Sequence, residues 1–215
     1  MSNEQQQGNN LDSWLDAYAA RAETLAVSEV RALFSVVSRP EVVSLAGGMP
    51  YVSALPQELL AKAYNDMMAK KGNLAIQYGG GQGDLVLRDQ IRELMALEGI
   101  QSSVEDLVIT TGSQHGLDLL SGLFLDKGDV VVAEGPSYVG ALGIFRHYEA
   151  DVEHVYTDHD GMSPEALQET ITKLKAEGRK IKFLYLVPNF ANPSGVTLSA
   201  DRRPKILEIC KREHI

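Results

Sequence analysis

The sequence of 215 residues contains a single cysteine, Cys210, so no disulfide bond can form within one chain. A chain of this size without an internal disulfide fits a reducing compartment. The isoleucines Ile206 and Ile209 lie at helical spacing from Cys210. This spacing favours a thiol that packs in the protein interior over a reactive one.

Long apolar runs are also missing. No stretch approaches the roughly 20 apolar residues that a membrane-spanning helix needs. The first ten residues, MSNEQQQGNN, have neither the basic segment nor the apolar segment of a secretory signal. These absences predict a soluble protein of the cytoplasm that has no membrane partner.

Positive charge is scarce, with 20 Lys and Arg against 29 Asp and Glu, a net charge of −9. Such a chain has no electrostatic basis for binding nucleic acid. The rest of the composition, 44% hydrophobic and 23% charged, is that of an ordinary globular protein.

The C-terminal half of the sequence alternates apolar strands with amphipathic helices. We predict strands at 106–111, 129–135, 151–157 and 181–187, and helices at 113–125, 137–149, 163–178 and 199–215. This alternation is typical of a mostly parallel sheet with helices on both faces. The predicted fold class is therefore α/β, a three-layer structure.

The N-terminal half is predicted to be mainly helical, with a short strand that ends in a Gly-Gly turn at 41–50. Apolar residues at helical spacing from Leu11 to Val37 indicate a helical arm, and two further helices are expected at 56–70 and 84–99. At the other end, the alternation calls for another strand after Ile215. We therefore expect a truncated chain whose sheet has an unpaired edge and exposed apolar surface.

Three junctions between strands and helices carry polar or aromatic residues, and ligands of open α/β sheets bind at such junctions. The helix start at Gly112, Ser113 and Gln114 offers N–H groups to a phosphate. Tyr138 can cover a flat ring, and Asn192 supplies an amide. Taken singly, each also fits an ordinary structural role, as a helix cap, a packing aromatic or a turn. Together they favour a flat heterocycle that carries a phosphate.

Two other patterns predict no ligand. The glycine-rich YGGGQGD at 78–84 matches neither the Walker pattern nor the dinucleotide-binding pattern, so we interpret it as a turn. The histidines show no metal-ligand spacing with Cys210. His115, next to the phosphate motif, is expected on the surface of a helix or packed against it.

Five motifs occur together in one order: LAGGMP, YGGGQGDLVLRDQI, ITTGSQHGLDLL, EGPSYVGAL and PNFANPSG. They resemble the class I aminotransferases of fold type I, which depend on pyridoxal phosphate, and in particular the branch of 2-aminoadipate and aromatic aminotransferases. The resemblance extends from about Val42 to Ile215. It implies that residues 53–215 form the N-terminal part of the cofactor-binding large domain, and that 1–52 form an arm and part of the small domain.

The resemblance implies a role for each junction. Gly112, Ser113 and Gln114 would hold the phosphate of pyridoxal 5'-phosphate, and Tyr138 would stack on its pyridine ring. Asn192 would donate a hydrogen bond to the phenolic oxygen of that ring.

It also implies residues for the substrate and for a second subunit. Tyr78 would reach the active site of the partner in a homodimer, and would contact the cofactor there. Gly47, Gly48 and Asn192 would border the substrate. For Asn189 we prefer a turn role, because asparagine often hydrogen-bonds its own backbone in turns.

The implied activity is transfer of an amino group from an amino acid to a 2-oxo acid. The lysine that forms the Schiff base, and the arginine that binds the substrate carboxylate, are expected after Ile215 in the family pattern. No catalytic residue is therefore assigned in this chain, and we expect the chain alone to be inactive. Lys205 and Lys211 are interpreted as surface charges. The residues present specify no particular amino acid.

Two alternatives remain open. One is the cofactor-binding sensor domain of a transcription regulator that resembles an aminotransferase but catalyses no reaction. Such regulators carry a basic DNA-binding segment upstream, and residues 1–40 are too few and too acidic for one. The other is an inactive scaffold whose site is never completed.

Overall fold

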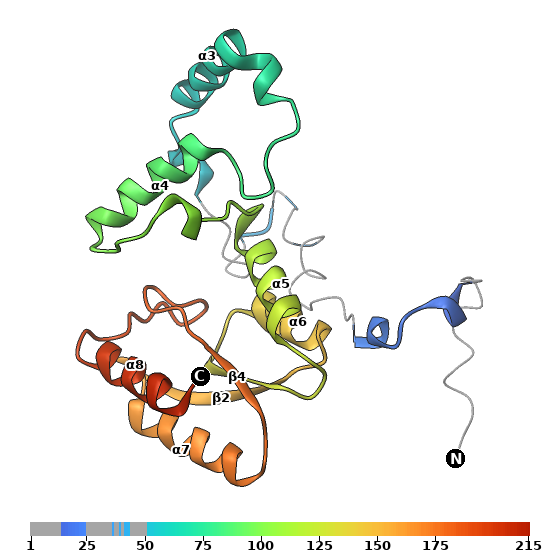
Figure 1. Cartoon of the computed structure of the whole chain (residues 1–215), viewed down its shortest axis with the longest axis vertical. Helices are drawn as coiled ribbons and strands as arrows, with labels where there is room; N and C mark the ends of the chain where they lie inside the picture. Colours follow the sequence, from blue (N-terminus) through green and yellow to red (C-terminus); the bar gives the residue numbers. More distant parts are fainter. Residues whose placement is uncertain (1–13, 25–35, 37–38, 40, 44–50) are drawn as a thin grey trace. The chain divides into compact units, whose positions relative to one another are not determined.

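The computed structural model describes residues 14–24, 36, 39, 41–43 and 51–215 (Figure 1). The chain divides into two compact units. The first comprises Met1–Ala32 and Gln114–Ile215, and the second comprises Leu33–Ser113.

The first unit is built around a four-stranded sheet. Its strands are β1 (Val130–Gly135), β2 (Asp151–Asp158), β3 (Gly161–Met162) and β4 (Ile181–Tyr185), in the order β3-β2-β1-β4. β1 pairs in parallel with β2 and β4, and the short β3 runs antiparallel to β2. Because β1 and β4 are parallel neighbours, the loops that follow them leave the sheet at the same side, where the carboxyl ends of the strands lie.

Helices cover both faces of this sheet. They are α5 (Gly112–Phe124), α6 (Val139–His147), α7 (Pro164–Ala176) and α8 (Arg202–Glu213). One core cluster joins alternate residues of β1 to α7 and α8, and the other joins Val131 to α6, with Leu117 of α5 at its margin. Figure 1 shows α7 and α8 on one side of the sheet and α5 and α6 on the other. The predicted three-layer α/β arrangement is therefore confirmed.

The start of α7 shows why these helices can be located from the sequence. Ser163 caps the helix by accepting a hydrogen bond from the Ala166 N–H at 3.2 Å, and Pro164 occupies its first turn. On the inner face, Leu167, Ile171 and Leu174 are each at most 1% exposed. Cap and apolar stripe are both local patterns, and both agree with the prediction.

The second unit contains two longer helices, α3 (Gln57–Ala75) and α4 (Leu85–Leu97), with the short 3-10 turns η3 (Val52–Ala54) and η4 (Val104–Asp106). Asp84 caps α4 by accepting a hydrogen bond from the Leu87 N–H at 2.9 Å. Gly99 follows the end of the helix with φ +78°, a conformation that glycine adopts without strain.

The strand predicted at 106–111 is wrong. These residues belong to no strand, and the Ile109 N–H donates instead to the carbonyl of Gln82, at 2.9 Å. A β-strand exists only where a second strand continues the ladder, and an isolated loop carbonyl does not supply one. Apolar composition alone therefore misassigned this segment.

The predicted helical arm at 11–37 lies partly outside the described residues. Within residues 14–24 its described part forms two 3-10 turns, η1 (Leu15–Ala17) and η2 (Ala20–Thr24), and Val36 is helical. Of the short strand expected at 41–50, residues 41–43 belong to no strand and 44–50 lie outside the described residues. Among the helices that the structure describes, none combines the length and the apolar character needed to cross a membrane.

Candidate functional site

The turn that follows β1 is fixed by a buried hydrogen bond. After Gly135 the chain passes through a cis peptide bond to Pro136 and reaches Tyr138, the residue before α6. The buried Ser137 hydroxyl donates to the carbonyl oxygen of Glu134 at 2.5 Å. The turn is thereby tied back to the last residues of the strand, which gives Tyr138 a defined starting position.

The ring of Tyr138 lies back over the first turn of α6. A Cβ added at Gly140 would come within 2.5 Å of the Tyr138 Cζ and hydroxyl oxygen, so the ring occupies the space that a side chain would need. The Tyr138 hydroxyl donates to Oε1 of Gln114 at 3.3 Å. The structure therefore brings together two of the predicted site residues, Tyr138 and Gln114.

The predicted phosphate motif forms the start of α5. Gly112 and Ser113 are the first two residues of this helix, and Gly112 has φ +79°. The Thr110 hydroxyl donates to the Gly112 carbonyl at 3.0 Å. The first turn of α5 carries no acidic residue. The Gly112 N–H donates to the Thr110 carbonyl at 2.9 Å, and the N–H groups that follow it in the first turn have no partner within the helix. A helix start of this kind suits an anion.

The loop after β4 presents Asn192 to solvent. Its base is closed by the Leu198 N–H, which donates to the Pro188 carbonyl at 2.9 Å. A second bond, from the Ala191 N–H to the Val196 carbonyl at 2.8 Å, closes its tip. Asn192, in cis linkage to Pro193, is exposed within this tip. Asn192 and Tyr138 thus follow neighbouring parallel strands at one edge of the sheet.

Glu134, at the end of β1, lies beside the candidate site and was not predicted from the sequence. It is 3% exposed, and its Oε1 accepts a hydrogen bond from the Val187 N–H at 2.8 Å. Burial raises the pKa of the Glu134 carboxyl, and the Val187 bond opposes part of that rise. The Tyr185 hydroxyl also has a raised pKa, first because of burial and then because of the Glu134 charge. The signal in the sequence is an acid at the end of an otherwise apolar strand.

Arg203 was missed as well. Its Nε donates to the Leu198 carbonyl at 3.1 Å, and its Nη2 donates to Oδ1 of Asn189 at 2.7 Å. Asn189 lies in a bend, and its side-chain oxygen is bound by Arg203 of α8. The sequence holds no local sign of this contact, because the two residues are 14 positions apart.

The other predicted residues lie elsewhere. Tyr78 belongs to the second unit and is 99% exposed. Gly47 and Gly48 lie outside the described residues. His115 is exposed on α5, and Cys210 is half-buried beside the α7–α8 cluster, where burial raises the pKa of its thiol.

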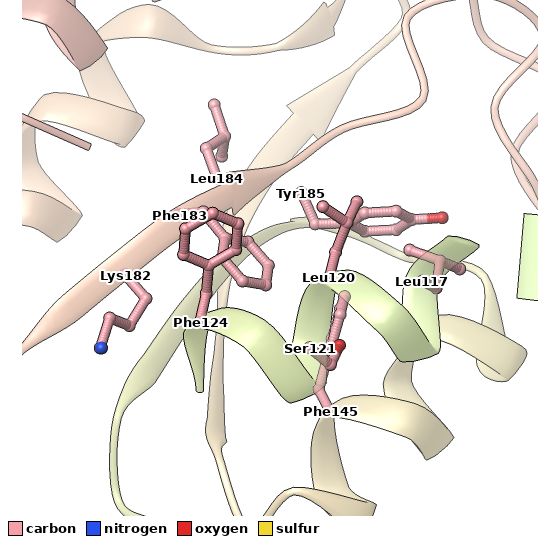
Figure 2. A pocket seen from close by; sticks show the side chains of 9 residues that line it. All are labelled: Leu117, Leu120, Ser121, Phe124, Phe145, Lys182, Phe183, Leu184 and Tyr185. Atoms are coloured by element: carbon pink, nitrogen blue, oxygen red, sulfur yellow. The ribbon is translucent and has the colours of Figure 1, made fainter. Parts of the chain in front are cut away.

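A cavity of about 310 Å³ lies between α5 and β4. Figure 2 shows its lining from both elements, with Leu120 and Phe124 from the helix, and Phe183 and Tyr185 from the strand. The lining is almost wholly apolar and includes none of the predicted site residues. This cavity is therefore distinct from the candidate site at the edge of the sheet.

In the first unit, Gln114, Tyr138 and Asn192 are side chains of the types that can contact a flat ring with polar substituents. The first turn of α5 carries no carboxylate, and the space beside Gly140 holds the ring of Tyr138. Asn192 supplies a donor amide beyond the end of the neighbouring strand. Taken singly, a helix start is able to bind an anion, an aromatic side chain to cover a ring face, and an amide to donate to a ring oxygen.

A model of the family "Aminotransferase class I and II" matches residues 40–215. The aromatic-amino-acid aminotransferase 1 of Thermococcus litoralis is 35% identical over 91% of this chain and 47% of its own length. The 2-aminoadipate transaminase of Thermus thermophilus is 34% identical over 92% of this chain and 47% of its own.

A solved structure shows the same likeness. The kynurenine aminotransferase of Pyrococcus horikoshii, crystallised in complex with PMP, matches with a TM-score of 0.85 and 36% identity, over 92% of this chain and 49% of that one. The chain thus spans about half the length of the relatives it matches. The regulator NorG of Staphylococcus aureus is also similar, at 27% identity over 80% of this chain.

Proposed function

Because the chain belongs to the class I and II aminotransferases, we propose that the protein containing it is a transaminase that depends on pyridoxal phosphate. It would transfer an amino group from an amino acid to a 2-oxo acid. The family match over residues 40–215 carries this proposal. The placement of Tyr138 and Asn192 beyond neighbouring strands supports it.

Each of the candidate residues would have one task in binding the cofactor. The backbone at Gly112 and Ser113, with the Gln114 side chain, would hold the phosphate at the start of α5. Tyr138 would cover one face of the pyridine ring, held by its bond to Gln114. Asn192 would donate to the phenolic oxygen and favour its anionic form. The bound cofactor would supply the electron sink for the reaction, and the protein its orientation.

We also propose that activity requires the second half that the relatives carry. The Schiff-base lysine of the family pattern is expected after Ile215. Lys205 is an unsuitable substitute because it is exposed on α8 and lies 3.6 Å from the carboxylate of Asp201. Lys211 is exposed on the same helix. The chain alone would therefore form part of a cofactor site and would not catalyse amino transfer.

The proposal extends to the assembly and the substrate. We propose a cytoplasmic homodimer in which the exposed Tyr78 enters the partner's active site. Gly47, Gly48 and Asn192 would border the substrate. An exposed aromatic side chain on a loop is free to make such a contact, since no described residue of its own unit covers it.

The test is the intact mass of the protein, expressed at its full genetic length and reduced with borohydride in the presence of pyridoxal phosphate. We expect one reduced cofactor, attached to a lysine beyond Ile215, and turnover of an amino acid with a 2-oxo acid. A protein that takes up no cofactor would refute the proposal.

Cofactor uptake without amino transfer would instead favour the sensor domain of a regulator, for which the similarity to NorG is the supporting observation. Assays with several amino donors separate this outcome from a poor choice of substrate.

A further inference from the structure

The loop that carries Asn192 is bound from two sides by charged side chains. Glu134, at the end of β1, binds the loop where it leaves β4. Arg203, in the first turn of α8, binds it on the other side. The residues come from two different elements, and both contact the base of the loop rather than Asn192 itself.

Glu134 connects the two junctions of the candidate site. Its side chain accepts from the Val187 N–H at 2.8 Å, which places the start of the Asn192 loop. Its backbone carbonyl accepts from the Ser137 hydroxyl, which places the turn that ends at Tyr138. The same carbonyl lies 3.2 Å from Nδ1 of His154 on β2. One residue therefore contacts both the turn that ends at Tyr138 and the start of the Asn192 loop.

Arg203 fixes the opposite side of the loop. Its guanidinium donates to the backbone carbonyls of Leu198 and Pro188. It also donates to the side-chain oxygen of Asn189. Pro188 and Leu198 are themselves joined by the backbone bond that closes the loop. Arg203 thus binds both ends of the loop, at Pro188 and at Leu198.

Stability alone does not account for Glu134. Burying a carboxyl group costs free energy, and an apolar side chain at the end of an apolar strand avoids that cost. The neighbouring strand residues Val130, Val131 and Val132 are such side chains and are at most 1% exposed. What an apolar residue would lose is the bond to the Val187 N–H, and with it the position of the loop.

We infer that Glu134 and Arg203 are positioning residues that hold Asn192 at a fixed distance from Tyr138 for cofactor binding. This inference rests on the proposed function, because it assigns the two residues to the site of that cofactor. Neither residue is required to touch the cofactor.

The test compares Glu134→Leu, Glu134→Gln and Arg203→Leu with the unaltered protein at its full genetic length. One readout is hydrogen exchange at the N–H groups of Ala191 and Leu198, which donate to the backbone carbonyls of Val196 and Pro188 and to neither side chain. The other is the dissociation constant of pyridoxamine phosphate. Arg212→Leu, at the far end of α8, is the matched control.

We expect Glu134→Leu and Arg203→Leu to speed exchange at these amides, and to weaken binding of pyridoxamine phosphate, each by roughly tenfold. Exchange in α7 and β2 should stay unchanged. Glu134→Gln keeps an acceptor for the Val187 N–H and should retain near-normal exchange and affinity. Arg212→Leu should change neither readout.

Unchanged exchange at the loop amides of the two Leu variants would overturn the inference, because it would show that the side chains do not hold the loop. Faster exchange throughout the first unit would also overturn it, because it would show a general structural role. Variants that bind pyridoxamine phosphate as tightly as the unaltered protein would also overturn it. If the unaltered protein binds no pyridoxamine phosphate, it is the proposed function that fails, and the inference fails with it.

Discussion

At the scale of single residues, α6 contains two glycines, Gly140 and Gly143, whose surroundings differ. A Cβ at Gly140 would meet the ring of Tyr138 at 2.5 Å, whereas a Cβ at Gly143 would meet nothing within 4 Å. Both lie inside the helix, where alanine is favoured over glycine by about 1 kcal/mol. The pair therefore separates the effect of helix propensity from the position of Tyr138.

We predict that Gly143→Ala raises the free energy of unfolding by about 1 kcal/mol and leaves cofactor binding unchanged. Gly140→Ala should displace the Tyr138 ring and break its bond to Gln114, weakening the binding of pyridoxamine phosphate. Urea unfolding and a binding titration of both variants provide the check. Equal affinity in the two variants would show that the ring can shift without consequence.

At the scale of elements, α7 depends on its buried face. Ile171 is 1% exposed in the cluster that joins α7 to β1 and α8, and its neighbour Thr172 is exposed. We predict that Ile171→Ala lowers the free energy of unfolding by about 2–5 kcal/mol, because it removes buried methyl groups and leaves a cavity. Thr172→Ala should change it by less than about 0.5 kcal/mol. Urea unfolding of the two variants tests this, and similar losses in both would contradict the assigned packing.

An ion pair joins β2 to the start of α8. Arg202 donates to both carboxylate oxygens of Asp158, at 2.7 and 2.9 Å. These bonds lower the pKa of Asp158 from 3.8 to about 2. A carboxyl whose pKa is lowered by folding stabilises the protein above its ordinary pKa, and that contribution is lost as the pH falls towards the lowered value.

We therefore predict that stability declines between pH 3.8 and about 2 as Asp158 becomes protonated. Arg202→Leu should lower the melting temperature at neutral pH and make the decline in this interval shallower. Arg146→Leu, at an exposed position of α6, removes an equal charge without affecting this pair. Melting curves at several pH values compare the two. An unchanged slope in Arg202→Leu would contradict the prediction.

The same scale shows how far the sequence predicts the fold. Helices α3 to α8 were located because caps such as Ser163 and apolar stripes are patterns of neighbouring residues. The strand expected at 106–111 was misassigned because strand formation depends on a partner distant in the sequence. For the site, strand ends pointed to Tyr138 and Asn192. The bond between Glu134 and Val187 spans 53 positions and has no local signature.

At the scale of the whole molecule, the first unit leaves apolar surface uncovered. On α5, the side chains of Leu119, Leu120, Leu123 and Phe124 are each at least 50% exposed. Within the described part of the chain, β4 pairs only with β1, so its other edge has free backbone groups. An open strand edge beside an apolar cavity of about 310 Å³ favours association with further protein.

We predict that residues 1–215 alone are poorly stable and associate, since the relatives are about twice as long and this chain spans 47% of their length. The isolated chain should bind a hydrophobic dye and elute above its monomer mass, and the protein at its full genetic length should bind less dye per residue. Scanning calorimetry measures the stability of the isolated chain, and light scattering measures its mass in solution. Cooperative thermal unfolding of a monomeric 1–215 chain would contradict the prediction, because it would mean that the core beneath β1 and α7 stabilises the fold without any cover on α5 and β4.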